Sequence, residues 1–312
     1  MAAGGAAAMT VDSGIWIPIV LAAAAAQTVR NAAQRSLVKS AGTLPATFVR
    51  FVFGLPFAVG ALVVANAATD TPLPSAHPAF LAWVSLGAVA QLAATAFLIG
   101  AMEQRSFVVA VAYSKTEIMQ IGVYSILLLA EPVTVAAACA IALASAGVVL
   151  LSVKPLAERG AGFRSWLSPA AVLGLASGAG FALSAVGYRA ATLALDHPLP
   201  WISGIFALVF AQALQTLLLG GYLAVFNRPG LAEVLAQWRV SLLAGFTGAL
   251  ASTGWLTAFA MRSAVDVRIV GLVEVIYSYF LSRRFFVEPV ARREIWGIVL
   301  VVAGIVVIST MR

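Results

Sequence analysis

Residues 106–132, SFVVAVAYSKTEIMQIGVYSILLLAEP, decide how this chain is interpreted. The run is apolar and ends at Glu131-Pro132, but it is interrupted by Lys115 and Glu117. About 20 apolar residues in a helix cross a bilayer. A charge inside such a helix costs about 2.5–3.5 kcal/mol on insertion scales and needs a compensating role. The stretch therefore predicts a membrane-spanning helix with functional charged residues near its middle.

The composition extends this interpretation to the whole chain. Of the 312 residues, 62% are hydrophobic and 10% are charged, and the mean hydropathy is +1.00. A soluble domain has about 45–50% apolar and about 25% charged residues, so that class is excluded. The apolar runs are continuous rather than alternating, which favours helices over a membrane β-barrel.

The predicted fold is an all-α polytopic membrane protein with short, turn-rich connections and no appended soluble domain. No GxxxxGK[ST] phosphate loop occurs in the sequence. The ten expected spans lie near residues 14–34, 45–66, 79–101, 106–129, 133–153, 168–190, 200–226, 239–261, 265–286 and 292–310.

The charge and the rare residues narrow the function classes. The net charge is +7 with a pI near 10.1, which in a membrane protein reflects loops on the cytoplasmic face rather than nucleic-acid binding. Cys139 is the single cysteine, and His77 and His197 each precede a proline. We therefore expect no disulfide, metal site or cofactor. No Lys or Arg precedes Arg30, so the first apolar run is expected to stay as a span.

The two halves of the sequence resemble each other at an offset of 157 residues. The matched segments are Glu131-Pro132-Val133 with Glu288-Pro289-Val290, Glu117 with Glu274, and Ala146-Gly147 with Ala303-Gly304. The alternative is chance similarity between apolar helices. The matches predict two repeats, 14–153 and 168–310, of five spans each. An odd number of spans inverts the second repeat, an architecture typical of transporters with a site near the midplane.

The orientation follows from the basic residues. Twelve Lys and Arg lie on the side of the loops that follow the odd-numbered spans, and four lie on the opposite side. The positive-inside rule therefore places both termini outside the cytoplasm.

With these features the chain resembles the EamA branch of the drug/metabolite transporter superfamily over essentially its whole length. The resemblance rests on the ten spans, the two five-helix repeats and the Glu-Pro pairs after spans four and nine. Residues 112–117, AYSKTE, resemble the fourth-helix signature of one bacterial EamA subgroup. The resemblance implies transport across a bacterial inner membrane without naming a substrate. It also implies cytoplasmic termini, opposite to the charge bias.

Polar side chains form a stripe on the fourth expected span. Tyr113, Glu117, Gln120 and Tyr124 follow helical spacing on one face, whereas Lys115 points to another face. We expect the stripe to line a central cavity. The alternative is a buried network that joins helices.

The ninth expected span carries Glu274, Tyr277 and Ser278 on one face, and Glu274 is the repeat partner of Glu117. Two such carboxylates near the midplane would bind a cationic group or carry protons. Burial raises the pKa of a carboxyl group and a nearby cation lowers it, so the sequence leaves proton coupling open.

Further candidates lie on other expected spans. Arg30 and Asn31 share a face of the first span, where Arg30 would pair with a carboxylate, bind a substrate carboxylate or extend to the headgroups. Gln91 is a candidate for cavity lining. Trp255 would either stack on a solute or pack in the core.

The function predicted from these features is secondary active or facilitative transport of a small amphipathic metabolite, such as an amino acid or related zwitterion, by alternating access. The expected partners are this solute and the lipid bilayer, and the expected state is a monomer. A non-transporting membrane scaffold or lipid-interacting protein is the alternative, followed by an intramembrane enzyme, although no catalytic constellation is evident.

Overall fold

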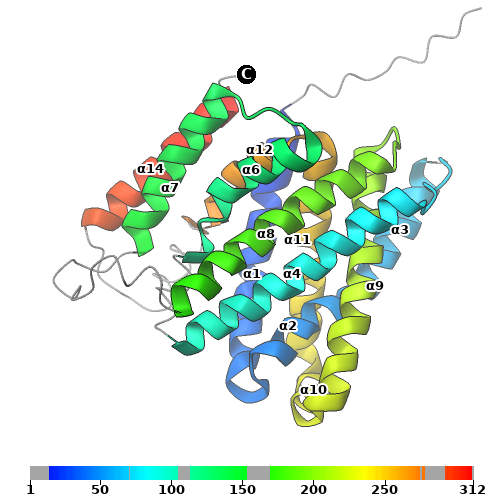
Figure 1. Ribbon diagram of the computed structural model, residues 1–312. Helices are drawn as coiled ribbons and strands as arrows, with labels where there is room; N and C mark the ends of the chain where they lie inside the picture. The colour runs from blue at the N-terminus through cyan, green and yellow to red at the C-terminus, as the bar shows by residue number, and fades with distance from the viewer. Residues whose placement is uncertain are drawn as a thin grey trace, which may run out of the picture.

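The structure, a computed structural model, describes residues 14–69, 71–104, 113–152, 169–274, 276–277 and 292–310. The regular secondary structure in these ranges is α-helical throughout (Figure 1), as the sequence predicts. The helices are α1 (Trp16–Ala41), α2 (Thr43–Val52), α3 (Leu55–Thr69), α4 (Pro78–Gln104), α6 (Glu117–Leu129), α7 (Val135–Ser152), α8 (Pro169–Ala194), α9 (Pro200–Phe226), α10 (Arg228–Ala236), α11 (Trp238–Met261), α12 (Ala264–Gly271) and α14 (Arg292–Thr310).

Among the described residues, five helical segments are long and apolar enough to cross a membrane. They are Thr43–Thr69, Pro78–Ala101, Ala171–Ala194, Pro200–Phe226 and Trp238–Met261. Shorter apolar helices cover Glu117–Leu129, Val135–Leu150 and Ile295–Thr310. Helix α1 is as long as the spanning helices, at 26 residues, but carries a polar stripe that includes Arg30.

The fourth expected span is interrupted at its charged residues. We expected Lys115 and Glu117 in mid-helix, but residues 115–116 form a turn and α6 begins at Glu117. The Thr116 N–H donates to the Tyr113 carbonyl at 3.2 Å, three residues back. The Thr116 hydroxyl also donates to that carbonyl, at 2.7 Å. A side chain that occupies a backbone acceptor in this way competes with the regular helix.

The ninth expected span has a matching interruption. Helix α12 ends at Gly271, and the Leu272 N–H donates to the Ile269 carbonyl at 3.1 Å, again three residues back. The chain is helical again at Val273 and Glu274. The two carboxylates that match in the sequence therefore each lie just after a turn in the helical chain.

The connection after α9 contains a helix that the sequence analysis treated as a loop. Helix α10 begins after Asn227, whose side-chain oxygen accepts from the Gly230 N–H at 3.1 Å. Asn and Pro are typical at the start of a helix, so the Asn-Arg-Pro-Gly turn initiates a short helix here.

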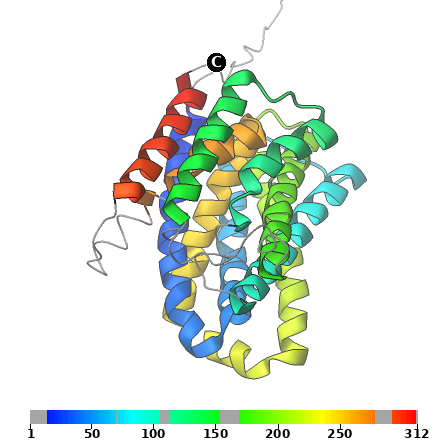
Figure 2. The ribbon, with the colours of Figure 1, turned by 60° about the vertical axis from the view of Figure 1, so that its left-hand side comes forward.

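Helices from the two halves of the chain pack together in pairs. Helix α1 packs along α11, α4 along α8, and α7 along α14, and Figures 1 and 2 show α7 and α14 side by side. Small residues allow this close approach. A Cβ on Gly147 would lie 2.6 Å from the Gly297 carbonyl oxygen, and one on Gly304 would lie 3.0 Å from that of Ala140.

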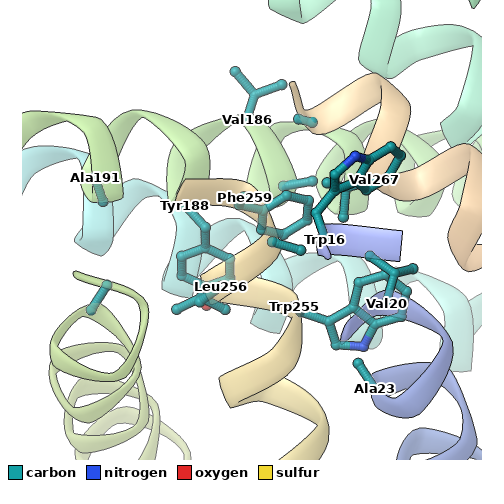
Figure 3. Packing of buried hydrophobic residues seen from close by; sticks show 14 of the residues in the cluster. Trp16, Val20, Ala23, Val186, Tyr188, Ala191, Trp255, Leu256, Phe259 and Val267 are labelled. Atoms are coloured by element: carbon teal, nitrogen blue, oxygen red, sulfur yellow. The ribbon is translucent and has the colours of Figure 1, made fainter. Parts of the chain in front are cut away.

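The largest buried cluster joins the two halves (Figure 3). Trp16 and Val20 of α1 pack in the same cluster as Trp255 and Phe259 of α11 and Val267 of α12. Helix α10 lies at the end of the bundle opposite the C-terminal end of α14 (Figures 1 and 2).

Candidate functional site

A cavity of 290 Å³ lies inside the bundle between the two halves of the chain. Its walls come from α1, α2, α4, α8, α9, α11, α12 and the interruptions next to α6 and α12. The ionisable side chains of its lining are Arg30, Arg50, Lys115, Glu117, Tyr188, Arg268 and Glu274. An apolar bundle thus encloses charges of both signs.

Glu117 is paired with a cation from the second half. Its Oε1 accepts from Nη2 of Arg268 in an ion pair, and the Glu117 side chain is 6% exposed. Glu117 is also the first residue of α6, where the helix dipole favours a negative charge. The Arg268 guanidinium lies 5.5 Å from the centroid of the Trp255 ring. The charge of Glu117 is therefore balanced by that of Arg268.

Glu274 is held by two amides instead of a cation. Gln27 Nε2 donates to its Oε2 at 2.5 Å, and Asn31 Nδ2 donates to its Oε1 at 2.9 Å. Both amides come from α1, one turn apart. Each carboxylate oxygen thus accepts one hydrogen bond.

Two groups that can only donate fix the orientation of these amides. The Trp255 indole N–H donates to Gln27 Oε1 at 3.0 Å, and Arg30 donates to Asn31 Oδ1 through Nε at 3.2 Å and Nη2 at 2.8 Å. Because an indole and a guanidinium accept no hydrogen bond, the amide oxygens must face them. The amide NH₂ groups are therefore left to face Glu274.

A neutral network forms another part of the wall. Gln215 Nε2 donates to Gln91 Oε1 at 2.7 Å, and the Tyr188 hydroxyl donates to the same oxygen at 3.3 Å. These side chains come from α9, α4 and α8, so the network joins three helices across the two halves.

The predicted site residues fall into three groups. Those that line the cavity are Arg30, Asn31, Gln91, Lys115, Glu117, Trp255 and Glu274. Those outside its lining are Tyr113, Gln120, Tyr124 and Tyr277. Ser278 lies outside the described residues.

The expected stripe of the fourth span is divided by the turn before α6. Gln120 donates to Thr116 Oγ1 at 2.9 Å and to the Leu175 carbonyl at 3.4 Å, so it joins α6 to α8. Tyr124 and Tyr277 pack against the main core cluster. Of the four stripe residues, Glu117 lines the cavity, whereas Gln120 and Tyr124 contact neighbouring helices instead.

The sequence analysis did not select several lining residues. Arg268 was counted only toward the orientation of the chain, although it stands in an apolar segment six residues before Glu274. Gln212 and Gln215 lie three residues apart in the otherwise apolar α9, and helical residues at this spacing share a face. That polar pair was a signal available in the sequence.

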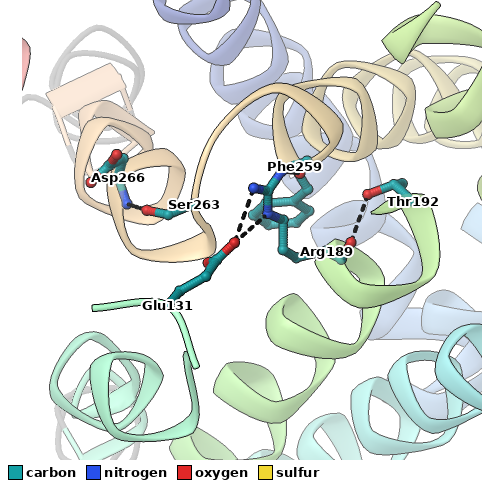
Figure 4. Close-up of polar contacts among 6 residues, drawn as sticks. All are labelled: Glu131, Arg189, Thr192, Phe259, Ser263 and Asp266. Atoms are coloured by element: carbon teal, nitrogen blue, oxygen red, sulfur yellow. Dashed lines mark hydrogen bonds and ion pairs between the residues drawn. The ribbon is translucent and has the colours of Figure 1, made fainter. Parts of the chain in front are cut away.

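A second polar cluster lies near the start of α12 (Figure 4). Glu131 Oε1 accepts from Nε and Nη2 of Arg189, both at 3.0 Å, and Arg189 Nη1 donates to the Phe259 carbonyl at 2.6 Å. This cluster joins the α6–α7 connection to α8 and α11. A larger cavity of 420 Å³ near it has Arg262 and Asp266 as its charged lining.

Comparisons with known proteins support the fold alone. No family model and no curated protein sequence matches this chain. One solved structure, described only as the crystal structure of a protein, is similar with a TM-score of 0.69 at 17% sequence identity. The similarity covers 94% of this chain and 96% of that chain, so the whole architecture occurs in a second protein.

Proposed function

We propose that this protein is a secondary active or facilitative transporter that moves a small amphipathic metabolite across the bacterial inner membrane by alternating access. The observation that carries the proposal is the 290 Å³ cavity, which holds both carboxylates and cations inside an apolar bundle. Ionisable residues in such a position mark substrate or ion pathways, because a purely structural bundle gains nothing from them.

The internal symmetry supports the same function. We infer ten spans in two inverted five-helix repeats, because Glu117 and Glu274 match in sequence and lie beside matching helix interruptions. The pairings of α1 with α11 and of α4 with α8 exchange under the same repeat. Interrupted helices at the junction of inverted repeats are typical of transporter binding sites. The EamA resemblance implies the same architecture.

Alternating access requires that contacts at one end of the cavity break while others form. The Glu131–Arg189 pair is a candidate for a closing contact, since it joins three segments near the α12 end of the bundle. The surrounding pairs of helices would tilt as units about the cavity, because their close backbone contacts resist separation. A single chain encloses the site, which agrees with a monomer.

Transport by reconstituted protein tests the proposal. Proteoliposomes with purified protein would be assayed for saturable uptake of labelled amino acids, organic acids and amines. Glu117→Gln should lower the uptake about tenfold or more, because an unpaired Arg268 then faces the cavity. Glu233→Gln on α10 is the matched control, since Glu233 accepts a hydrogen bond from Gln237 within α10 and its turn, outside the cavity lining.

The outcomes separate transport from the alternatives. Saturable uptake that Glu117→Gln abolishes and Glu233→Gln retains supports transport through this cavity. Equal uptake by both variants would mean that the cavity is not the route. Uptake no faster than in protein-free liposomes for every solute class would contradict the function and favour a scaffold.

A further inference from the structure

Two arginines from different helices meet on one side of the cavity. Arg30 of α1 and Arg50 of α2 both line it, and both pack against Gly248 of α11. A Cβ at position 248 would lie 3.2 Å from Arg30 Cδ and 3.4 Å from Arg50 Cβ. Arg30 is 7% exposed. The stems of a buried and a half-buried arginine thus pack on the same glycine, and both side chains line one cavity.

Within the described residues neither arginine forms an ion pair with a carboxylate, and the Asn31 amide lies between Arg30 and Glu274. The Arg30 guanidinium donates to the Asn31 amide oxygen, and Arg50 lies 4.5 Å from the centroid of the Phe51 ring. Among the described residues, neither arginine has a carboxylate oxygen within 4.0 Å, and the same holds for Lys115. A buried charge without an ion-pair partner costs several kcal/mol in effective desolvation, which applies to Arg30, whereas Arg50 and Lys115 are half-buried.

The charged residues of the cavity lining together carry a net positive charge. Four cations face two carboxylates, Glu117 is already paired with Arg268, and Glu274 is held by two amides. The lining therefore carries a formal charge of +2 before any solute enters. A guanidinium presents its N–H groups in a planar fork that matches the oxygens of a carboxylate or phosphate.

Gln212 adds an unsatisfied polar group to the same cavity. It is 3% exposed, and its Oε1 has no hydrogen-bond partner in the described part of the chain. Its amide lies beside Gly54, one turn after Arg50, where a Cβ would come within 2.9 Å of Gln212 Nε2. Buried amide groups are normally hydrogen-bonded, and an amide oxygen only accepts, so this one calls for an O–H or N–H donor elsewhere on the occupant than its anionic oxygens.

We propose that the cavity binds a small organic anion, with its carboxylate or phosphate oxygens between Arg30 and Arg50. The inference rests on the transport site proposed above and deepens it. The substrate then carries a net negative charge instead of the balanced charge of a zwitterion.

A set of probes with one ring and different charges tests this assignment. Purified wild-type protein in detergent would be titrated with benzoate, phenyl phosphate, benzamide and benzylamine, and its thermal midpoint recorded. We expect a saturable rise with an anionic probe and none with benzamide or benzylamine. The relative affinity of benzoate and phenyl phosphate distinguishes a carboxylate from a phosphate substrate.

Variants place the binding at the arginines. Arg50→Gln should weaken binding of the anionic probe about 10- to 100-fold, the range expected for the loss of a charged hydrogen bond. Arg50→Lys should retain part of the affinity, since the charge remains without the fork. Arg228→Gln is the matched control, because Arg228 is exposed and donates to the Ala224 carbonyl on the surface.

Each result has a separate meaning. Benzamide or benzylamine binding as tightly as the anions would overturn the inference, even if the protein transports. Failure of both anions to bind wild-type protein would also overturn it, and that measurement needs no variant to fold. Anion binding at Arg50 without uptake by proteoliposomes would keep the inference and contradict the transport function.

Discussion

Glu117 and Glu274 occupy the same position in the two repeats that the sequence suggests, but their surroundings differ. Glu117 forms an ion pair with Arg268, whereas Glu274 accepts hydrogen bonds from the amides of Gln27 and Asn31. The charge of the first carboxylate is balanced by a guanidinium of the protein, whereas the second is hydrogen-bonded to neutral amides. Equivalent positions therefore carry different electrostatic roles, and the difference makes the cavity asymmetric.

Trp255 links the two regions. Its indole N–H donates to Gln27, which holds Glu274, and its ring lies beside the guanidinium of Arg268, which pairs with Glu117. One side chain of α11 therefore contacts a partner of each carboxylate, Gln27 for Glu274 and Arg268 for Glu117.

The largest expected effect comes from Glu117→Gln. The substitution leaves Arg268 without its counter-charge, and removal of one partner of a buried pair costs about 3–5 kcal/mol. Because the Arg268 side chain is 24% exposed, we expect about 3 kcal/mol, at the lower end of that range. Reversible unfolding in mixed detergent micelles measures the loss.

The double variant Glu117→Gln/Arg268→Gln sharpens this result. It removes both charges, so it should recover part of the stability that the single variant loses. A double variant less stable than the sum of the two single changes would show that the ion pair is not the source of the effect.

Gly271→Ala should have the next largest effect. A Cβ at this position would lie 2.4 Å from a carbon of the Trp255 ring, so the ring must shift. Such overpacking costs about 1–3 kcal/mol. Gly60→Ala on α3 is the control, since no atom lies within 4 Å of its added Cβ. Equal melting temperatures for the two variants would contradict close packing at Gly271.

Glu274→Gln should be milder than Glu117→Gln. The new amide accepts one of the two hydrogen bonds and loses the other, which costs about 1 kcal/mol. Glu274→Gln also removes a negative charge from the cavity, so the affinity for benzoate should rise. Isothermal titration of the purified variants checks the sign, and a fall in benzoate affinity would argue against an anion site.

Trp255→Phe should have an effect similar in size to that of Glu274→Gln. The substitution keeps a ring beside Arg268 and removes the N–H that orients Gln27, with an expected loss of about 1 kcal/mol. Trp238→Phe is the control, because Trp238 is 54% exposed. If thermal melts show a loss under Trp255→Phe that exceeds the loss under Glu274→Gln, packing of the indole outweighs its hydrogen bond.

The sequence by itself determined the helical class, the apolar character and the positions of the unusual charges. These follow from local composition, because continuous apolar runs and isolated charges are visible residue by residue. The sequence similarity that predicts a repeat was also visible, through Glu117 with Glu274 and the two Glu-Pro pairs. Seven of the predicted site residues line one cavity. A polar side chain in an apolar helix needs a polar environment, so its presence in the sequence already indicated such a place.

Only the tertiary structure decided which groups meet. The pairs Glu117–Arg268 and Gln27–Glu274 join residues 151 and 247 positions apart, and no local pattern selects such partners. The turn before α6 separates Tyr113 from the rest of the stripe, because the Thr116 side chain and i−3 hydrogen bonds replace a regular helical turn. Gln120 and Tyr124 follow Glu117 on α6, but the neighbouring helices place them against α8 and the main core cluster. Arg30 and Arg50 both contact Gly248 because α1 and α2 pack against α11. This packing brings both arginines to one cavity, and with them the lining has a net positive charge.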